Sequence, residues 1–361
     1  MVRSRYGQIG LLLAAAVAVQ LATRAAGMEY LLTQLTMAAY YTLVAVGLSL
    51  VMGYAGQISL GHAGFFAIGG YTSAVLTTLD LGAARGHPLV SALARAHLVA
   101  PRADLYGGEI LSVEPWAAFA CALLLTLAVA FAIGVPVLKL KGHYLAMATL
   151  GFGTIVYSVI LGTQRFGAAD GVSGVPPFQL LPGLAVHGKA SARVANFYVA
   201  WGLVAACMLV LLNLIRSRVG RALRAIHGAE DAARAMGVDA ARYKLRTFIL
   251  SALLAATGGV FLAHYNGGIG PSEATVLKSI RYLAVVAVGG MGSLWGTLTM
   301  SAVLSFLSLR GSFGTYDDAV FGLILIGVML FSPDGLLRLD LPPAVRGALR
   351  RLRPPPPEVR P

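Results

Sequence analysis

Long runs without a charged residue alternate with short charged segments along the chain. The charge-free runs cover 6–23, 30–79, 115–138, 142–164, 194–215, 247–272, 282–309 and 319–333. A charged side chain at the centre of a membrane helix costs about 2.5–3.5 kcal/mol on insertion scales, and a spanning helix needs about 20 residues. The runs therefore predict membrane helices, and the charged segments predict the connections between them.

Two of the runs are predicted to contain a break. The run 30–79 has 50 residues, and as one helix it would be about 75 Å long, more than twice the hydrocarbon thickness. We place its turn at 53–57, Gly-Tyr-Ala-Gly-Gln, because glycines interrupt the apolar pattern there. The run 282–309 contains Gly-Gly-Met-Gly at 289–292, which predicts a second break between two short helices.

Basic residues predict the number and direction of the crossings. They gather at Arg3 with Arg5, at Lys139 with Lys141, at eight positions in 216–246 and at six in 332–361. Because cytoplasmic loops of membrane proteins are enriched in Lys and Arg, all four clusters are assigned to the cytoplasm, and the number of crossings is then even. The predicted fold is an all-α, polytopic membrane bundle of about ten segments with both termini inside the cell. Segments 80–114 and 163–196 then lie outside.

The composition excludes an ordinary soluble protein. Hydrophobic residues make up 57% and charged residues 12% of the chain, against roughly 45–50% and about 25% in globular proteins. The net charge of +13 fits cytoplasmic basic loops beside anionic lipid, and no nucleic-acid partner is predicted. Cys121 and Cys207 both lie in apolar runs, so a disulfide framework is not supported.

The two ends of the chain leave alternatives open. Residues 6–23 are either a retained helix or a cleaved signal peptide, because basic residues precede a short apolar core. The transmembrane domain is expected to cover 1–340. Residues 341–361 form a basic, proline-rich cytoplasmic tail that is predicted to be disordered beside anionic lipid, with recognition by a proline-binding partner as the alternative.

The sequence lacks the motifs of an enzyme. Gly188-Lys189 is followed by Ala190 without the glycine spacing of a phosphate-binding loop, and no H-E-x-x-H, C-x-x-C or G-x-S-x-G occurs. The seven histidines are dispersed, so neither a metal site nor a cofactor is predicted. Of the ionisable residues, only His62 and His264 are expected at depth in the membrane. Since ion-coupled transporters usually carry charged groups there, energy for any uphill transport is expected to come from elsewhere.

Four segments together resemble the permease subunits of branched-chain amino-acid ABC importers, the LivH/LivM family. They are GYAGQISLGHAGFFAIGGY at 53–71, KGHYLAMATLGFG at 141–153, a basic segment at 220–244 that contains GRALRAI and AARAMG, and VGGMGSLWG at 288–296. The closing FSPDGLL at 331–337 favours the LivM-like type. The segment 80–114 is longer than the family leads us to expect, and Asp-Gly-Val-Ser-Gly at 170–174 replaces a plainer loop.

The resemblance implies a set of partners and a location. The chain would pair with a second homologous permease in the bacterial inner membrane, with two cytoplasmic ATPase subunits and with a periplasmic solute-binding protein. ATP would be hydrolysed by the ATPase subunits. The expected solutes are branched-chain or similar small amino acids, with urea and short amides left open. The alternative from another class is a secondary transporter or facilitator channel for a small polar solute.

The two breaks supply the candidate pathway residues. Glycine permits non-helical backbone and close helix contact, and exposed backbone and side-chain groups there could hydrogen-bond a solute. Packing between helices is the alternative role for the same residues. The candidates are Gln57, Ser59, Gly61, His62, Gly289, Gly290, Ser293 and Trp295.

The segment 216–246 is the candidate contact with the ATPase. Glu230, Ala233 and Met236 lie at helical spacing before Gly237, which predicts a short helix that ends at a glycine. Its position resembles the ATPase-contacting loop of ABC permeases, and a loop lying on anionic lipid is the alternative. The candidate contact residues are Arg221, Arg224, Glu230, Ala233 and Gly237.

Overall fold

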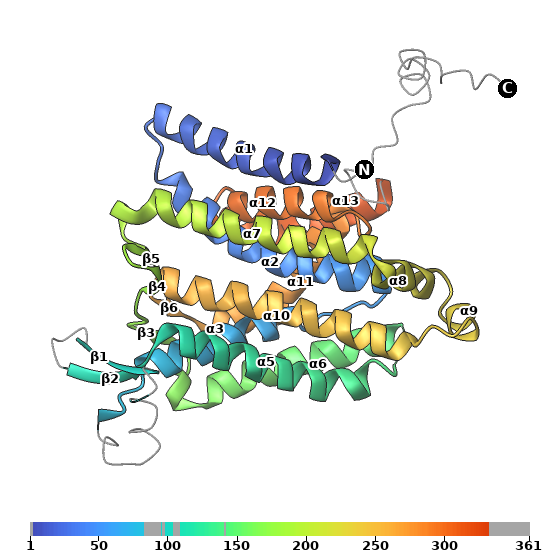
Figure 1. Ribbon diagram of the computed structural model, residues 1–361, viewed down its shortest axis with the longest axis horizontal. Helices are drawn as coiled ribbons and strands as arrows, with labels where there is room; N and C mark the ends of the chain where they lie inside the picture. The colour runs from blue at the N-terminus through green and yellow to red at the C-terminus, as the bar shows by residue number, and fades with distance from the viewer. Residues whose placement is uncertain (1–2, 83–94, 96–97, 104–108, 141, 332–361) are drawn as a thin grey trace.

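The chain forms a bundle of helices that lie side by side along one long axis (Figure 1). The computed structural model describes residues 3–82, 95, 98–103, 109–140 and 142–331. The predicted tail at 341–361 lies outside these residues.

Among the described residues, ten helices lie within or overlap the charge-free runs. Six of those in the described residues are long and apolar enough to cross a membrane: α1 (Arg3–Ala25), α2 (Leu31–Ala55), α5 (Pro115–Val137), α6 (His143–Gly162), α7 (Arg193–Arg216) and α10 (Ala240–Asn266). The other four are shorter: α3 (His62–Thr78), α11 (Val276–Gly289), α12 (Leu294–Leu309) and α13 (Asp317–Phe331).

Both predicted breaks are confirmed. Gly56 ends α2 in the left-handed conformation, with φ of 67°, and a non-helical connection leads to α3. Gly290 has φ of 92° and ends α11 four residues before α12 begins. A side chain with a Cβ rarely adopts such φ values, so glycine at these two positions allows the chain to leave the helix.

The two ends of the bundle differ in structure. One end carries the short α8 (Arg218–Gly228) and α9 (Glu230–Ala235), and the N-terminal end of α1 lies on this side (Figure 1). The opposite end, here called the strand end, carries three antiparallel strand pairs. These are β1 (Val99–Ala103) with β2 (Glu109–Val113), β3 (Val172–Ser173) with β6 (Gly268–Ile269), and β4 (Phe178–Leu181) with β5 (Leu184–Val186).

The strand end also holds most of the short 3-10 turns. The described turns are η2 (Gln164–Phe166), η3 (Ala190–Ala192), η4 (Pro271–Ala274) and η5 (Gly314–Tyr316). The described parts of the segments predicted to lie outside, 80–114 and 163–196, therefore lie at one end of the molecule, and segment 216–246, which is predicted to be cytoplasmic, lies at the other (Figure 1).

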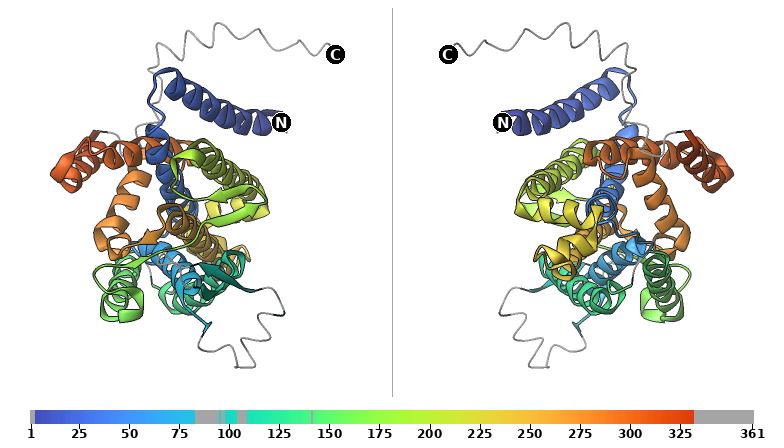
Figure 2. Two further views of the ribbon diagram at one scale, coloured as in Figure 1. Left: turned by 90° about the vertical axis from the view of Figure 1, so that its left-hand side faces the viewer. Right: turned by 90° about the vertical axis from the view of Figure 1, so that its right-hand side faces the viewer.

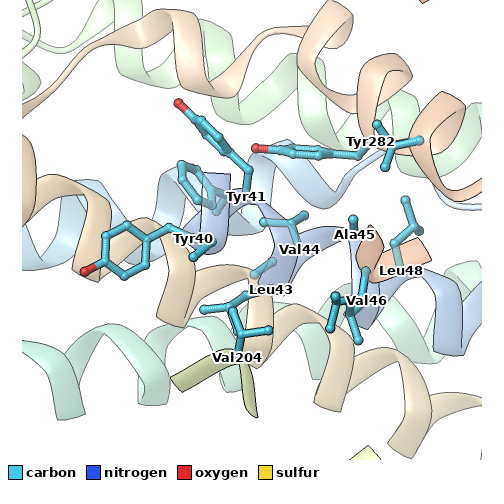
Figure 3. Packing of buried hydrophobic residues seen from close by; sticks show 14 of the residues in the cluster. Tyr40, Tyr41, Leu43, Val44, Ala45, Val46, Leu48, Val204 and Tyr282 are labelled. Carbon is cyan, nitrogen blue, oxygen red and sulfur yellow. The ribbon is translucent and has the colours of Figure 1, made fainter. Parts of the chain in front are cut away.

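Helix α2 forms the centre of the bundle. In the apolar 18-residue stretch of α2, 89% of the residues are buried, whereas the share is 28% in the matching stretches of α5 and α6. A helix that is apolar on all sides suits such a position, because every face meets another helix. The end views in Figure 2 show the other helices arranged around α2, with α1 set apart along the outside. Figure 3 shows the dense packing of Leu43, Val44 and Leu48 in this core.

Glycines bring α3 and α10 into backbone contact. A Cβ on Gly259 would lie 2.0 Å from the carbonyl oxygen of Phe66, and a Cβ on Gly69 would lie 2.4 Å from that of Ala256. Small residues at a membrane helix interface permit this approach, and van der Waals packing then stabilises it. The first segment of the family resemblance is thereby packed against α10.

Two helices begin earlier than the charge-free runs indicated. Helix α10 starts at Ala240 and α11 at Val276, six or seven residues before the runs at 247 and 282. As a result, Lys278 and Arg281 belong to α11 and pack against other helices, although the sequence had placed them in a connection.

Candidate functional site

The connection between α2 and α3 is held by a buried histidine. His62 shares a hydrogen bond of 3.0 Å through Nδ1 with Ser59 Oγ, and another of 2.7 Å through Nε2 with Ser251 Oγ on α10. Its ring meets Phe65 and Phe248 edge to face. Both ring nitrogens are therefore occupied, and His62 joins the break to α10.

The other two candidates in this connection differ in their surroundings. Gln57 is 1% exposed, and within the described residues its side-chain amide has no hydrogen-bond partner. Buried polar atoms are nearly always hydrogen-bonded, so this amide is the candidate best able to meet a polar solute. Gly61 instead packs on α6, since a Cβ there would lie 2.7 Å from the carbonyl oxygen of Thr149.

The second break is a close crossing between α11 and α12. A Cβ on Gly289 would lie 2.6 Å from the Cα of Thr297. Ser293 caps α12 by accepting a hydrogen bond of 3.1 Å from the Gly296 amide. Trp295 is partly buried against the core, and its indole N–H has no partner in the described part of the chain.

The structure brings the two breaks together at the α8 end of the bundle. A Cβ on Gly53 would overlap the carbonyl group of Met291, and the Tyr54 hydroxyl donates a hydrogen bond of 3.0 Å to the carbonyl of Gly292. Segments almost 240 residues apart in sequence thus form one unit. Whether the eight candidates line a pathway stays a prediction.

The described cavities lie elsewhere. A cavity of about 390 Å³ lies between α1, α2, α7 and α12 and is lined almost entirely by apolar side chains, with none of the eight candidates among them. Across the described residues, no group of three or more His, Cys, Asp or Glu side chains is placed to hold a metal ion.

The segment 216–246 folds into a helical hairpin, made of α8, α9 and the start of α10. Glu230 forms ion pairs with Arg234, at 2.6 Å, and with Lys244 on α10. Ala233 is 6% exposed and packs with Ile226 inside the hairpin. These two candidates therefore hold the hairpin together, and other residues form its surface.

The surface of the hairpin is formed by exposed basic residues and one exposed methionine. Arg221 and Arg224 lie on exposed positions of α8, and Gly237 has φ of 81° directly after α9. Met236 is 85% exposed at the tip. Sequence reasoning noted its helical spacing but did not select it; an apolar residue directly before the helix-ending glycine was the available signal.

The hairpin also contacts the first break. A Cβ on Gly56 would lie 2.8 Å from Nδ1 of His227 on α8. Gly56 is the left-handed residue that ends α2, so a displacement of α8 would act directly on the connection that carries Gln57 and His62.

A second polar group near the strand end was missed by the sequence. The Tyr41 hydroxyl donates a hydrogen bond of 2.9 Å to Glu273 Oε1, and Lys278 Nζ lies 3.1 Å from the same oxygen. Nearby, Arg281 on α11 forms ion pairs of 2.7 Å with both Asp317 and Asp318 at the start of α13. These partners are far apart in sequence, and no local pattern indicates that they meet.

Sequence comparison places the chain in a known group. The profile of the family described as "Branched-chain amino acid transport system / permease component" matches residues 30–331. The chain belongs to this family. The match covers the helices from α2 to α13, and with them both breaks and the α8–α9 hairpin.

Among its relatives in the branched-chain permease family are LivM and BraD proteins. The high-affinity branched-chain amino acid transport system permease protein LivM of Escherichia coli is 32% identical over 329 residues, which cover 85% of this chain and 70% of LivM. BraD of Pseudomonas aeruginosa is 28% identical over 86% of this chain and 95% of its own. LivH of Escherichia coli is 27% identical over the same shares. The expected resemblance to this family, and to LivM in particular, is confirmed.

A solved structure gives a weaker match. PsaBC from Streptococcus pneumoniae in complex with Fab aligns with a TM-score of 0.37 and 16% identity, over 83% of this chain and 89% of the other. A score this low supports no structural argument. The branched-chain permeases are membrane subunits of transport systems. Membership of their family therefore supports a permease role for this chain.

Proposed function

We propose that the chain is one of two homologous membrane subunits of an ATP-driven importer of branched-chain or similar small amino acids. Two cytoplasmic ATPase subunits supply the energy, and a periplasmic solute-binding protein delivers the solute. Membership of the branched-chain permease family supports this role. The absence of a phosphate-binding loop from the sequence is the reason for assigning ATP hydrolysis to other subunits.

The observation that carries the proposal is the α8–α9 hairpin and its contact with the first break. The hairpin projects from one end of the bundle (Figure 1). Its Met236 side chain is exposed. An apolar anchor beside exposed arginines suits insertion into a groove of a protein partner. Because His227 on α8 contacts Gly56, movement of the ATPase would be transmitted to the junction of α2 and α3.

This proposal also assigns the two ends to the two sides of a bacterial inner membrane. The α8–α9 end faces the cytoplasm, because segment 216–246 carries eight of the 28 basic residues. The strand end then faces the periplasm and meets the solute-binding protein. With ten crossings, both termini lie in the cytoplasm.

The test is uptake of labelled leucine into liposomes. The chain alone should give no uptake, and the chain with its permease partner, ATPase subunits and binding protein should give uptake that requires ATP. Uptake by the chain alone would contradict the proposal and identify a facilitator. Uptake by the complete set of subunits without ATP would also contradict the proposal. So would the failure of the complete set to import any amino acid when ATP is present.

A further inference from the structure

Five side chains meet near the strand end and are here called the Glu273 cluster: Tyr41 on α2, Tyr71 on α3, Glu273 on η4, and Lys278 and Tyr282 on α11. The three tyrosines are almost fully buried, with exposed fractions of 6%, 3% and 5% in that order. Glu273 interacts electrostatically with each of them. The Glu273 carboxylate is thus bonded to Tyr41 and Lys278 and lies within electrostatic range of the Tyr71 and Tyr282 phenols.

The hydrogen bonds of the cluster use only one of the two oxygens of the Glu273 carboxylate. Oε1 accepts both from the Tyr41 hydroxyl and from Lys278. Within the described residues, Glu273 Oε2 and the hydroxyls of Tyr71 and Tyr282 have no hydrogen-bond partner. Buried polar atoms are nearly always paired in native proteins. An unpaired carboxylate oxygen with two unpaired hydroxyls near it therefore indicates a site for a hydrogen-bond donor.

Two of the rings lie next to each other, and one of them contacts a positive charge. The ring centroids of Tyr41 and Tyr282 are 6.3 Å apart, and Figure 3 shows both hydroxyls pointing to the same side, away from Leu48. Lys278 Nζ already lies 4.4 Å from the centre of the Tyr41 ring. A cavity of about 50 Å³ lies beside the cluster and is lined by Tyr41, Lys278 and Tyr282, with Arg281 also in its wall and Glu273 outside its lining. It has room for a small polar group and too little for a whole branched side chain.

We propose that the Glu273 cluster binds the ammonium group of an amino acid during its passage, an inference that rests on the proposed function. A primary ammonium has three N–H donors, and the cluster offers three unpaired oxygens, one of them charged. Phenol rings add attraction for a cation. A calcium ion fits less well, because it takes six to eight oxygen ligands and the cluster offers fewer.

The site selects solutes by charge. Amino acids carry the required ammonium group, and urea and simple amides do not. The cluster therefore narrows the expected solutes to amino acids, and it lies near the strand end, where solute would enter from the proposed periplasmic side.

The experiment compares variants of the complete importer in leucine uptake at saturating binding protein. Glu273→Gln removes the negative charge and should lower uptake about tenfold or more, as expected for loss of a charge-assisted hydrogen bond. Tyr282→Phe should lower uptake about threefold while leaving the thermal unfolding temperature unchanged or higher, because its hydroxyl has no partner within the described chain.

Tyr40→Phe is the matched control. Its hydroxyl is also buried and without a partner in the described residues, but its ring packs on Phe261 and Tyr265. Figure 3 shows it on a different side of α2 from Tyr41. Uptake by Tyr40→Phe should equal that of the unaltered protein, and an equal loss in both tyrosine variants would overturn the proposal.

A double variant separates solute binding from a structural ion pair. If Glu273 only neutralises Lys278, then Glu273→Gln with Lys278→Met should restore uptake, since replacing both partners of a buried pair is often neutral. If Glu273 binds the solute, uptake should stay low. Restored uptake, or normal uptake by Glu273→Gln alone, overturns this inference. Failure of the unaltered complex to import any amino acid would instead contradict the proposed function.

Discussion

Single glycines determine how closely the helices approach. Gly259 and Gly202 both lie inside long membrane helices, α10 and α7. A Cβ on Gly259 would lie 2.0 Å from the Phe66 carbonyl oxygen, whereas a Cβ on Gly202 would have nothing within 4 Å. The same residue type is therefore required at one position and dispensable at the other.

We predict opposite effects of alanine at these two positions. Gly259→Ala should destabilise the protein by about 1–3 kcal/mol, because the added methyl group would force the backbone of α3 at Phe66 to move. Gly202→Ala should be neutral or stabilising by up to about 1 kcal/mol from helix propensity. Thermal unfolding of the purified protein measures both. Equal unfolding temperatures for the two variants would contradict the contact between α3 and α10.

The positions of the two breaks could be predicted from the sequence, but the hydrogen-bond partners of the residues in them could not. Glycines between apolar runs indicated where the chain leaves the helix. The bond from His62 to Ser251 joins residues 189 positions apart, and such pairing is set by helix packing. The same reason hid the Glu273 cluster, where Tyr41 and Glu273 are 232 positions apart. Ala233 was chosen for its spacing, which cannot distinguish the inner face of a hairpin from its outer face.

At the scale of elements, the charge-free runs mark the expected membrane interior and the helices extend beyond it. Helix α10 continues through Arg242, Lys244 and Arg246 before its apolar part. Asp239 caps its first turn by accepting from the Arg242 amide at 3.1 Å. A helix continues for as long as its backbone hydrogen bonds do. Charged side chains do not interrupt these bonds outside the lipid, so the charge-free run marks only part of the helix.

We predict that Gly237→Val weakens association with the ATPase without preventing membrane insertion. Gly237 has φ of 81°, and a left-handed conformation costs roughly 1–2 kcal/mol for a residue with a Cβ. The valine should shift the end of α9 and the position of Met236. The measurement is the amount of ATPase subunit that co-purifies with the membrane complex.

Gly228→Val is the control for that variant. Gly228 lies in the same hairpin, with helical backbone and nothing within 4 Å of an added Cβ. It should retain the ATPase. Full retention by both variants would indicate that the hairpin is only a basic loop beside the membrane.

At the scale of the whole molecule, segment 216–246 lies at the opposite end from the described parts of 80–114 and 163–196, as the basic clusters led us to expect. The strand pairs that join segments 163–196 and 268–269 were not predicted, because β3 and β6 have only two residues each. Such short strands carry no alternating pattern, and they form because helix packing brings their backbones together. The number of crossings and the side that each end faces remain predictions.

Thiol labelling tests the orientation. In a protein with Cys121→Ala and Cys207→Ala, a cysteine at Leu181, which is 65% exposed at the strand end, should react with a membrane-impermeant maleimide added to intact cells. A cysteine at Gly228 should react only after the membrane is opened. The reverse pattern would invert the proposed topology.

The close crossing of α11 and α12 has a consequence for biosynthesis. These helices have 14 and 16 residues, or roughly 21 and 24 Å at about 1.5 Å per residue, less than the ~30 Å of a hydrocarbon core. Helix α11 also carries Lys278 and Arg281 in its first two turns. Because both helices are short and α11 is charged, neither suits independent partition into lipid. They should leave the translocation channel as one hairpin, already joined at Gly289 and Gly296. A ribosome that stalls between the two would hold α11 at the channel until its partner is made.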